Sequence, residues 1–185
     1  MIKNKVTYLD KKNKSLRLVK FKRKHISKTY LGWLNDKKLK FSENRFSKHN
    51  YPSAINYLRE NAKNKNLFLA VELLRDKRYL HVGNVLLRID TKNKRGHLSI
   101  LIGINKNKGI GYQVWKKMLE IAFKTFNCKL VVAGSMKSNK AMFKIFKKCK
   151  MKILVLPGYF FQNRKKDDLI ISYKTRKNDV INKQF

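Results

Sequence analysis

The chain has 185 residues, 43% of them hydrophobic, which suits one globular domain and is too short for two. No apolar run reaches the roughly 18 residues of a membrane helix, and no signal-peptide core follows the charged amino terminus, so we expect a cytoplasmic protein with no membrane partner. The net charge of +35 comes from 36 Lys and 10 Arg spread over every segment, which indicates a solvated surface and an anionic substrate rather than a nucleic-acid-binding stripe.

The first half of the chain passes from a polar arm to strand and helix patterns. Residues 1–15 are polar and Lys-rich, typical of a loose arm or a short edge strand, and Leu16–Phe21 alternates like a strand. Apolar residues recur at helical spacing over His25–Leu34, and Pro52 suits the first turn of a second helix. Three strands joined by polar turns follow and predict an antiparallel meander: Leu67–Leu74, His81–Ile89 and His97–Ile104.

The second half opens on a glycine turn and alternates helices with strands. The expected elements are a helix over Tyr112–Phe126, a strand over Leu130–Ala133, a short helix opening on Asn139, and closing strands over Lys152–Leu156 and Leu169–Tyr173. This order predicts an α/β protein with a mixed, mostly antiparallel central sheet flanked by helices. We divide the chain into a basic N-terminal arm (1–15), one domain (16–174) and a polar C-terminal tail (175–185).

The glycine turn has the features of a phosphate cradle. Lys106-Asn107-Lys108-Gly109-Ile110-Gly111 lies between the apolar run Leu98–Ile104 and the predicted helix. Two glycines let the backbone bend sharply and aim consecutive N–H groups outward, and the start of the helix adds the positive end of its dipole. We therefore expect an anion, a diphosphate, to bind at this turn.

Other nucleotide-binding motifs fit the turn less well. A Walker loop requires Lys and then Ser or Thr after its last glycine, where this chain has Tyr112 and Gln113. A dinucleotide-binding fingerprint requires a third glycine and an acidic residue about 20 positions later, and both are missing. Cys128 and Cys149 are too few for a disulfide framework and have no metal-ligand spacing with the histidines, so we predict no metal site.

Together with the helix at Asn139, the turn resembles the GNAT superfamily of N-acetyltransferases. The acetyl-CoA loop of that superfamily reads Gln/Arg-x-x-Gly-x-Gly/Ala, which Lys106, Gly109 and Gly111 match, and its next helix opens on Asn, which Asn139 matches. The resemblance spans Leu16–Lys174. It implies a single-domain GNAT fold and an enzyme, an acetyl-CoA-dependent N-acetyltransferase, with acetyl-CoA as the cosubstrate.

The resemblance also implies how the cosubstrate is held. The backbone around Gly103 would pair with the pantetheine arm, the amides after Lys106 would hold the diphosphate, and Asn139 would touch the arm. The implied cofactor-binding residues are Ile102, Gly103, Ile104, Lys106, Lys108, Gly109, Ile110, Gly111, Tyr112, Asn139 and Phe146.

The catalytic residues depart from the family pattern. His97 stands where many relatives carry an acidic residue, and an imidazole that titrates near neutral pH could take the proton of the amine, with Ser99 on the same strand face as a bridge through water. A structural role for His97 stays open. Many relatives place a Tyr seven residues after the helix Asn as the acid for the thiolate, where this chain has Phe146, and the usual Gly-Phe pair after that helix is replaced by Lys150-Met151.

The first third of the chain sharpens the resemblance. Tyr30–Asp36 and Ser42–Phe46 are similar to bacterial members that acetylate nucleotide-linked amino sugars, of which the pseudaminic acid pathway type is closest in layout. The implied substrate-binding residues are Trp33, Asn35, Glu43, Asn44 and Arg45. Arg45 could grip a nucleotide diphosphate, although a core anchor, a helix cap and a surface ion pair explain Trp33, Asn35 and Arg45 as well.

Two other functions stay open at this point. Acetyltransferases that act on the amino terminus of ribosomal proteins share the Trp-x-Asn-Asp feature, and a basic nucleic-acid-binding module could use the same fold. The sequence also leaves a homodimer open.

Overall fold

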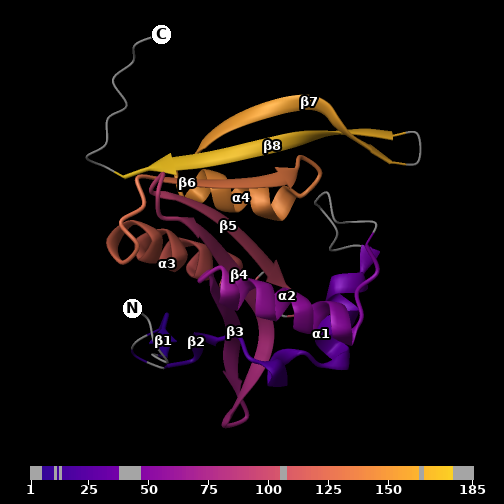
Figure 1. The fold of residues 1–185 in the computed structure, drawn as a ribbon, viewed down its shortest axis with the longest axis vertical. Helices are drawn as coiled ribbons and strands as arrows, with labels where there is room; N and C mark the ends of the chain where they lie inside the picture. The colour runs from indigo at the N-terminus through magenta and orange to yellow at the C-terminus, as the bar shows by residue number, and fades with distance from the viewer. Residues whose placement is uncertain are drawn as a thin grey trace.

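The computed structural model describes residues 6–10, 12, 14–37, 47–104, 108–162 and 165–176. Its elements confirm the predicted α/β class and the predicted order of strands and helices (Figure 1). In chain order they are β1 (Thr7–Tyr8), β2 (Leu16–Lys20), a 3-10 helix η1 (Arg23–His25), α1 (Lys28–Asn35), α2 (Tyr51–Lys63), β3 (Leu67–Arg75), β4 (Arg78–Asp90), β5 (Arg95–Ile102), α3 (Ile110–Lys124), β6 (Leu130–Met136), α4 (Lys140–Lys148), β7 (Lys152–Gln162) and β8 (Lys165–Thr175). None of the helices in these ranges is long and apolar enough to span a membrane.

The strands form one sheet of eight in the order β1-β2-β3-β4-β5-β6-β8-β7. β3, β4 and β5 make the predicted antiparallel meander, and β5 beside β6 is the parallel pair in a sheet whose other neighbours run antiparallel. The segment expected as an arm contributes β1, which pairs with β2 as an edge strand. The sheet is therefore mixed and mostly antiparallel, as predicted.

Helices cover both faces of the sheet, and the side chains of the central strands alternate between them. α3 and α4 lie against one face, and α1 and α2 against the other (Figure 1). On β3, Leu69 and Val71 join the core under α3, whereas Phe68 and Ala70 join the core under α1 and α2. This is the alternation that a strand with a side-chain period of two produces.

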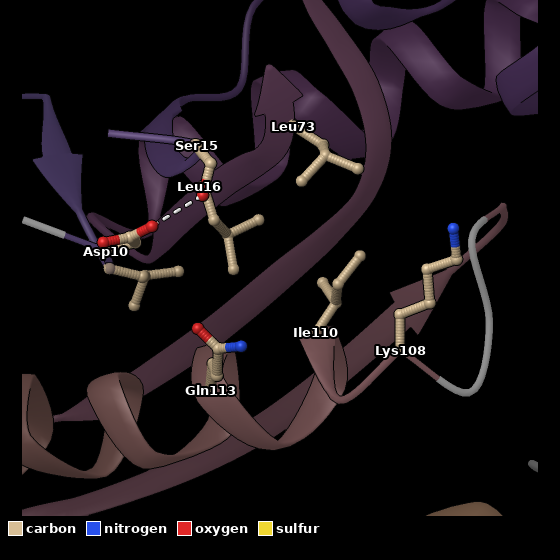
Figure 2. A pocket seen from close by; sticks show the side chains of 8 residues that line it. Asp10, Ser15, Leu16, Leu73, Lys108, Ile110 and Gln113 are labelled. Carbon is tan, nitrogen blue, oxygen red and sulfur yellow. Dashed lines mark hydrogen bonds between the residues drawn. The ribbon is translucent and has the colours of Figure 1, made fainter. Parts of the chain in front are cut away.

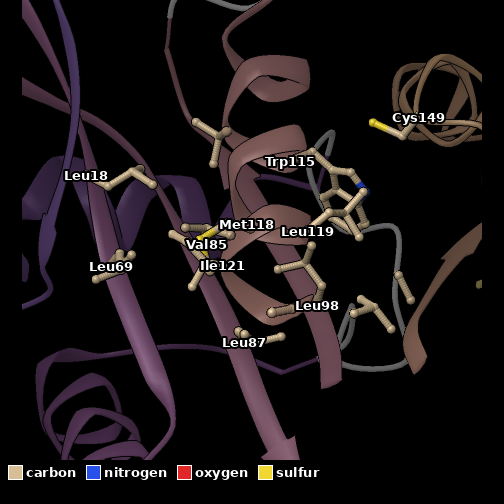
Figure 3. Close-up of a cluster of buried hydrophobic side chains, with 14 of the residues drawn as sticks. Leu18, Leu69, Val85, Leu87, Leu98, Trp115, Met118, Leu119, Ile121 and Cys149 are labelled. Atoms are coloured by element: carbon tan, nitrogen blue, oxygen red, sulfur yellow. The ribbon is translucent and has the colours of Figure 1, made fainter. Parts of the chain in front are cut away.

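α3 forms the centre of the larger core and has the predicted apolar face. Val114, Met118 and Ala122 are completely buried against the sheet, and Figure 3 shows Met118 among its neighbours in this core. Trp115 is 1% exposed and packs edge-on against Phe146, with ring centroids 5.6 Å apart. Burial of side chains of this size contributes about 1.5–3 kcal/mol each, so α3 is the main tie between the meander and the second half of the chain.

Two helices begin at different residues from those predicted because of local capping. His25, the first residue of the predicted helix, belongs to η1, and the Ser27 side chain accepts a hydrogen bond from Tyr30 N at 3.1 Å, so α1 starts at Lys28. α3 starts at Ile110 rather than Tyr112, because Gly109 in a left-handed conformation is its N-cap. In both cases a cap residue, rather than the apolar period, sets the boundary.

The last two strands are longer than predicted. β7 and β8 form an antiparallel hairpin with 11 residues in each strand. β7 continues past the predicted end at Leu156 to Gln162, and β8 begins at Lys165, before the predicted start at Leu169. Pro157 and Gly158 favour a strand end, but the register shifts between Leu156 and Phe160, which accommodates them and lets the pairing resume. The β-bulge explains why the apolar pattern alone gave strands that were too short.

Candidate active site

The sheet splits where β5 and β6 separate. The two parallel strands pair over Arg95–His97, and from Leu98 onward β5 has no partner on β6. On its other edge β5 stays paired with β4 as far as Ile102. The described backbone of β5 therefore presents a row of peptide groups to the gap, with which an extended ligand can pair as an added strand.

A cavity of about 540 Å³ lies at this split, a size typical of small-molecule sites. Its walls come from β5 and β6 and from the helices on both sides of the sheet. The aromatic lining residues are Tyr30, Trp33, Tyr57 and Trp115, and the neutral polar ones are Ser53, Asn56, Asn84, Ser99, Ser135 and Asn139.

Trp33 closes the cavity by packing on Gly103. It is 7% exposed and contacts Tyr30 and His81, whose ring centroids lie 6.2 Å and 5.2 Å from its own. A Cβ atom on Gly103 would lie 1.9 Å from the Trp33 ring. The indole therefore lies directly on the backbone that leaves β5, and only glycine leaves room for it.

The cavity carries little negative charge. Glu60 of α2 is the one carboxylate among the described residues that line it. The rest of the chain is strongly basic, with a net charge of +35. A positive field of this kind attracts anions.

The glycine turn has the geometry of an anion cradle in the residues that the structure describes. Gly109 has φ 73°, and no atom lies within 4 Å of the position a Cβ atom would take. Gln113 N donates to Gly109 O at 3.1 Å, and the amides of Ile110, Gly111 and Tyr112 before it donate no backbone hydrogen bond to a described residue. The N–H groups of the first turn at the positive end of α3, beside the open space at Gly109, fit a phosphate or diphosphate.

Gly111 serves helix packing rather than the turn itself. A Cβ atom there would lie 3.1 Å from Cδ1 of Ile145 on α4. The small residue lets α4 approach the first turn of α3. Of the two glycines, Gly109 alone has the left-handed backbone that the predicted bend requires.

The backbone after β5 is partly used within the protein. Gly103 N and Ile104 N both donate to Val82 O, at 3.0 Å and 3.4 Å. The amides of Gly103 and Ile104 are therefore not free for the predicted pairing with an extended ligand. The carbonyl groups of Ile102, Gly103 and Ile104 and the preceding residues of β5 remain for it. Lys106 lies outside the described residues.

Asn139 and Phe146 of the second motif have different environments. Asn139 lines the cavity and caps α4, because its side chain accepts from Met142 N at 3.2 Å and donates to Ser135 Oγ at 3.0 Å. Phe146 is 1% exposed and lies behind Trp115. Direct contact of Phe146 with a ligand conflicts with this burial, and its position supports Trp115, which does line the cavity.

Of the two predicted catalytic residues on β5, one lines the cavity and the other does not. Ser99 lines the cavity, whereas His97 is exposed on the same strand and lies opposite Arg88 in the β4–β5 register. Desolvation and the charge of Arg88 hold the pKa of His97 below its ordinary value of 6.5. The imidazole is therefore neutral at pH 7 and able to accept a proton.

The predicted substrate-binding residues fall into three groups. Trp33 lines the cavity. Asn35 instead joins the end of α1 to the chain before α2: its amide nitrogen donates to His49 O at 2.7 Å and its oxygen accepts from His49 N at 2.8 Å. Glu43, Asn44 and Arg45 lie outside the described residues.

Several lining residues were missed by the reading of the sequence. Ser53, Tyr57 and Glu60 occupy one flank of α2 at helical spacing, beside the buried residue Ala54. Their spacing is visible in the sequence as a polar stripe, but a polar stripe is also what a solvent-facing helix surface shows. Only the position of α2 beside the split sheet shows that this stripe lines a cavity and is not an ordinary solvent-facing surface.

The chain is similar to known proteins both in sequence family and in structure. The family model described as an acetyltransferase (GNAT) domain matches residues 15–152. No curated protein sequence gives a match.

Solved structures share the fold at low sequence identity. The spermidine N-acetyltransferase of Vibrio cholerae in complex with CoA and spermine superposes with a TM-score of 0.75 at 17% identity, over 87% of this chain and 95% of the other. The microcin C7 self-immunity acetyltransferase in complex with acetyl-CoA and AMP gives 0.69 at 19% identity, over 88% and 93%. A ribosomal L7/L12 alpha-N-protein acetyltransferase in complex with coenzyme A gives 0.75 at 10% identity, over 92% and 98%.

Proposed function

The chain belongs to the GNAT family of acetyl-CoA-dependent N-acetyltransferases, and from this premise we propose that it acetylates the amino group of a nucleotide-linked amino sugar. The residues after β5 fit the cosubstrate, since β5 offers a strand edge without a partner on β6 beyond His97 and the turn at Gly109 offers an open anion cradle. The acceptor class, the roles of the site residues and a cytoplasmic location are parts of the proposal.

The residues that line the cavity support a nucleotide-linked amino sugar as the acceptor. Tyr30, Trp33 and Tyr57 offer flat faces on which a sugar or a base can stack, and the neutral hydroxyl and amide groups around them suit sugar hydroxyls. Glu60 is the one carboxylate among the described lining residues, which in a basic protein disfavours a polyamine such as the spermine bound by one structural neighbour. An anionic acceptor gains from the same field.

One set of site residues binds acetyl-CoA, and another set binds the acceptor amine. Bound acetyl-CoA supplies a thioester carbonyl that a neutral amine can attack. The backbone after Leu98 orients the arm, and the amides from Lys108 to Tyr112 hold the diphosphate, with added charge from Lys106 and Lys108. Asn139 contacts the arm where it passes the start of α4.

On the acceptor side the chain positions the amine and removes its proton. Trp33 forms the wall of the acceptor site, and His97 takes the proton by way of Ser99 and a bridging water. Arg45, with Glu43 and Asn44 beside it in sequence, serves the nucleotide part of the acceptor, whereas Asn35 holds the segment before α2 in place. The sequence resemblance supports these roles, and the position of Trp33 and Ser99 in the cavity is consistent with them.

Substitution of Gly109 tests the cradle independently of the acceptor. Gly109→Val should weaken acetyl-CoA binding by roughly tenfold, because a β-branched residue is strained in the left-handed region by about 1–2 kcal/mol. Gly109→Asn should bind nearly as well as the wild type, since Asn tolerates this conformation and the space beside Gly109 is open. Calorimetric titration measures both, and equal affinities for the two variants would contradict the cradle.

A comparison of acceptors tests the function itself. The purified protein with acetyl-CoA should acetylate a UDP-linked 4-amino sugar with a kcat/KM at least about 100-fold above that for spermidine or for an amino-terminal peptide, measured by thiol release. Preference for the peptide or for spermidine would overturn the proposed acceptor.

Glu60→Gln adds a check on the charge argument. Loss of the cavity's one described carboxylate should leave the KM for the UDP-linked sugar unchanged or lower, because the substrate is anionic. A cationic acceptor would show the opposite change, a rise in KM of about tenfold, since it would lose its counter-charge.

A further inference from the structure

The side-chain oxygen of one asparagine in the cavity at the split sheet has no hydrogen-bond donor. Asn84 lies on β4 and lines this cavity. Its Oδ1 atom is buried and has no hydrogen-bond partner in the described part of the chain. Two further buried side-chain atoms there have no partner, His81 Nε2 and Ser172 Oγ, but neither residue lines the cavity. A buried amide oxygen costs free energy in the folded protein unless a donor reaches it, so Asn84 needs an explanation.

Other acceptors that line cavities of this protein are satisfied within the chain. In the same cavity, Asn139 Oδ1 accepts a hydrogen bond from Met142 N at 3.2 Å. A second cavity, of about 480 Å³, lies between the start of α3 and the β1–β2 edge, and there Asp10 accepts from Ser15 Oγ at 2.8 Å (Figure 2). The described residues supply a donor to both of these groups but none to the Asn84 oxygen.

Asn84 and Ser99 project from the same face of the sheet. Asn84 is opposite Leu101 in the β4–β5 register. Ser99 is opposite Leu86, which belongs to the core under α1 and α2. Residues two apart on a strand share a face, so both polar side chains point toward the aromatic wall that α1 and α2 provide. The two are diagonal neighbours on adjacent strands, about 7–8 Å apart, which leaves room between them for one small polar group that contacts both.

An acceptor amine brings the hydrogens that these two oxygens can accept. A neutral primary amine that attacks a thioester aims its lone pair at the carbonyl carbon and points its two N–H groups away from it. The amide oxygen of Asn84 can only accept, and because it is uncharged it does not favour the ammonium form as a carboxylate would.

We propose that Asn84 Oδ1 accepts a hydrogen bond from the acceptor amine and aims its lone pair at the thioester. Ser99 Oγ accepts from the second N–H group, whose proton then leaves by the route described above. The inference rests on the proposed function only for its reaction, acetyl transfer to an amine, and assigns Asn84 as the residue that orients the nucleophile.

Three variants separate this role from a structural one. Asn84→Leu keeps the shape of the side chain and removes the acceptor, whereas Asn84→Asp keeps an oxygen at the same reach and removes the amide nitrogen. Ser172→Ala is the matched control, since it removes a buried oxygen without a described partner that lies outside the cavity. Thiol release is measured with the acceptor that the wild type uses best among a UDP-linked 4-amino sugar, spermidine and an amino-terminal peptide.

Asn84→Leu should lower kcat by roughly tenfold, with KM and the acetyl-CoA dissociation constant within about twofold of the wild type, because the lost hydrogen bond orients the amine while stacking supplies most of the binding. Its melting temperature should be at least as high as that of the wild type, because the variant no longer buries an acceptor without a donor. Ser172→Ala should keep kcat within about twofold.

Asn84→Asp should retain kcat within about threefold at its optimal pH, since the acceptor oxygen is still present. A carboxylate beside the amine favours the protonated form, so the rising limb of kcat against pH should move to higher pH. The other titratable side chains among the described lining residues are common to all the variants: Tyr30, His49, Tyr57 and Glu60.

Four results would overturn the proposal. They are an unchanged kcat in Asn84→Leu, a fall in kcat that accompanies a lower melting temperature, an Asn84→Asp protein as inactive as Asn84→Leu, and an equal loss of kcat in Ser172→Ala. The third would mean that the amide nitrogen, rather than the oxygen, makes the contact. Preference of the wild type for spermidine or the peptide would remove the nucleotide-sugar acceptor but leave this comparison intact, because all three acceptors present a primary amine.

Discussion

Replacement of Gly103 by alanine should lower the free energy of unfolding by about 3 kcal/mol and abolish most acetyl transfer. The new Cβ atom would lie 1.9 Å from Cδ2 and 2.1 Å from Cε2 of Trp33, well inside van der Waals contact. Trp33 cannot yield easily, because Tyr30 and His81 pack around it. The clash therefore displaces either the backbone after β5 or the Trp33 wall of the cavity, and both are parts of the proposed active site.

Gly32→Ala is the matched control for this substitution. Gly32 lies in α1, one residue before Trp33, and no atom lies within 4 Å of the position its Cβ would take. Alanine there should stabilise the protein by about 0.5–1 kcal/mol, because glycine is unfavourable inside a helix. Urea unfolding measures both variants. A Gly103→Ala protein as stable as the wild type would show that Trp33 does not lie on this backbone.

The second large effect is a loss of stability on acidification that arises from His81. This ring on β4 lies among Phe21, His25, Tyr30 and Trp33, with centroids between 5.1 Å and 5.8 Å away. Its Nε2 atom is buried and has no hydrogen-bond partner among the described residues. Burial and the nearby His25 lower the pKa of His81 from 6.5 to about 4.

The direction of the effect follows from proton binding. Between pH 6.5 and pH 4 the unfolded chain binds a proton at His81 that the folded chain excludes, so the protein loses stability as the pH falls through this range. The difference between the pKa of His81 in the unfolded chain and in the folded protein corresponds to about 3 kcal/mol of unfolding free energy. The folded protein has this full stability above about pH 7.5 and loses it as the pH falls toward 4.

Comparison with His81→Phe isolates this contribution. Phenylalanine fits the surrounding rings and cannot titrate, so the variant should lose about 3 kcal/mol less than the wild type between pH 7.5 and pH 4. Glu72 is also buried there. Burial alone would raise its pKa, but hydrogen bonds from His25 and Arg17 hold the pKa below its ordinary value, and this contribution is common to both proteins and cancels. Parallel unfolding free energies at the two pH values would contradict the assignment.

The elements that were predictable are those whose signals are local. The left-handed Gly109 between a strand and a helix, the Asn139 cap of α4 and the alternation along β3 each depend on hydrogen bonds or side-chain directions within a few residues. The same locality explains the errors at element ends, where Ser27 and the bulge after Leu156 act within one turn or one register step.

The cavity was not predictable in the same way, because distant segments build it. Tyr57 and Glu60 reach it only because α2 lies over the split between β5 and β6, and Phe146 is excluded from it only because Trp115 stands in front. No spacing in the sequence indicates that α2 lies beside the split or that Trp115 separates Phe146 from the cavity. Each depends on packing between elements that are far apart in the chain.

The sequence by itself therefore determined the α/β order of elements, the glycine turn and the family, because periodicity, caps and turn residues act through neighbouring peptide groups. Only the tertiary structure decided that Gly103 makes room for Trp33, that Asn35 joins two segments of backbone, and that Ser99 reaches the cavity while His97 does not. These facts arise from close packing between segments, where one added methyl group or one strand face changes which atoms meet.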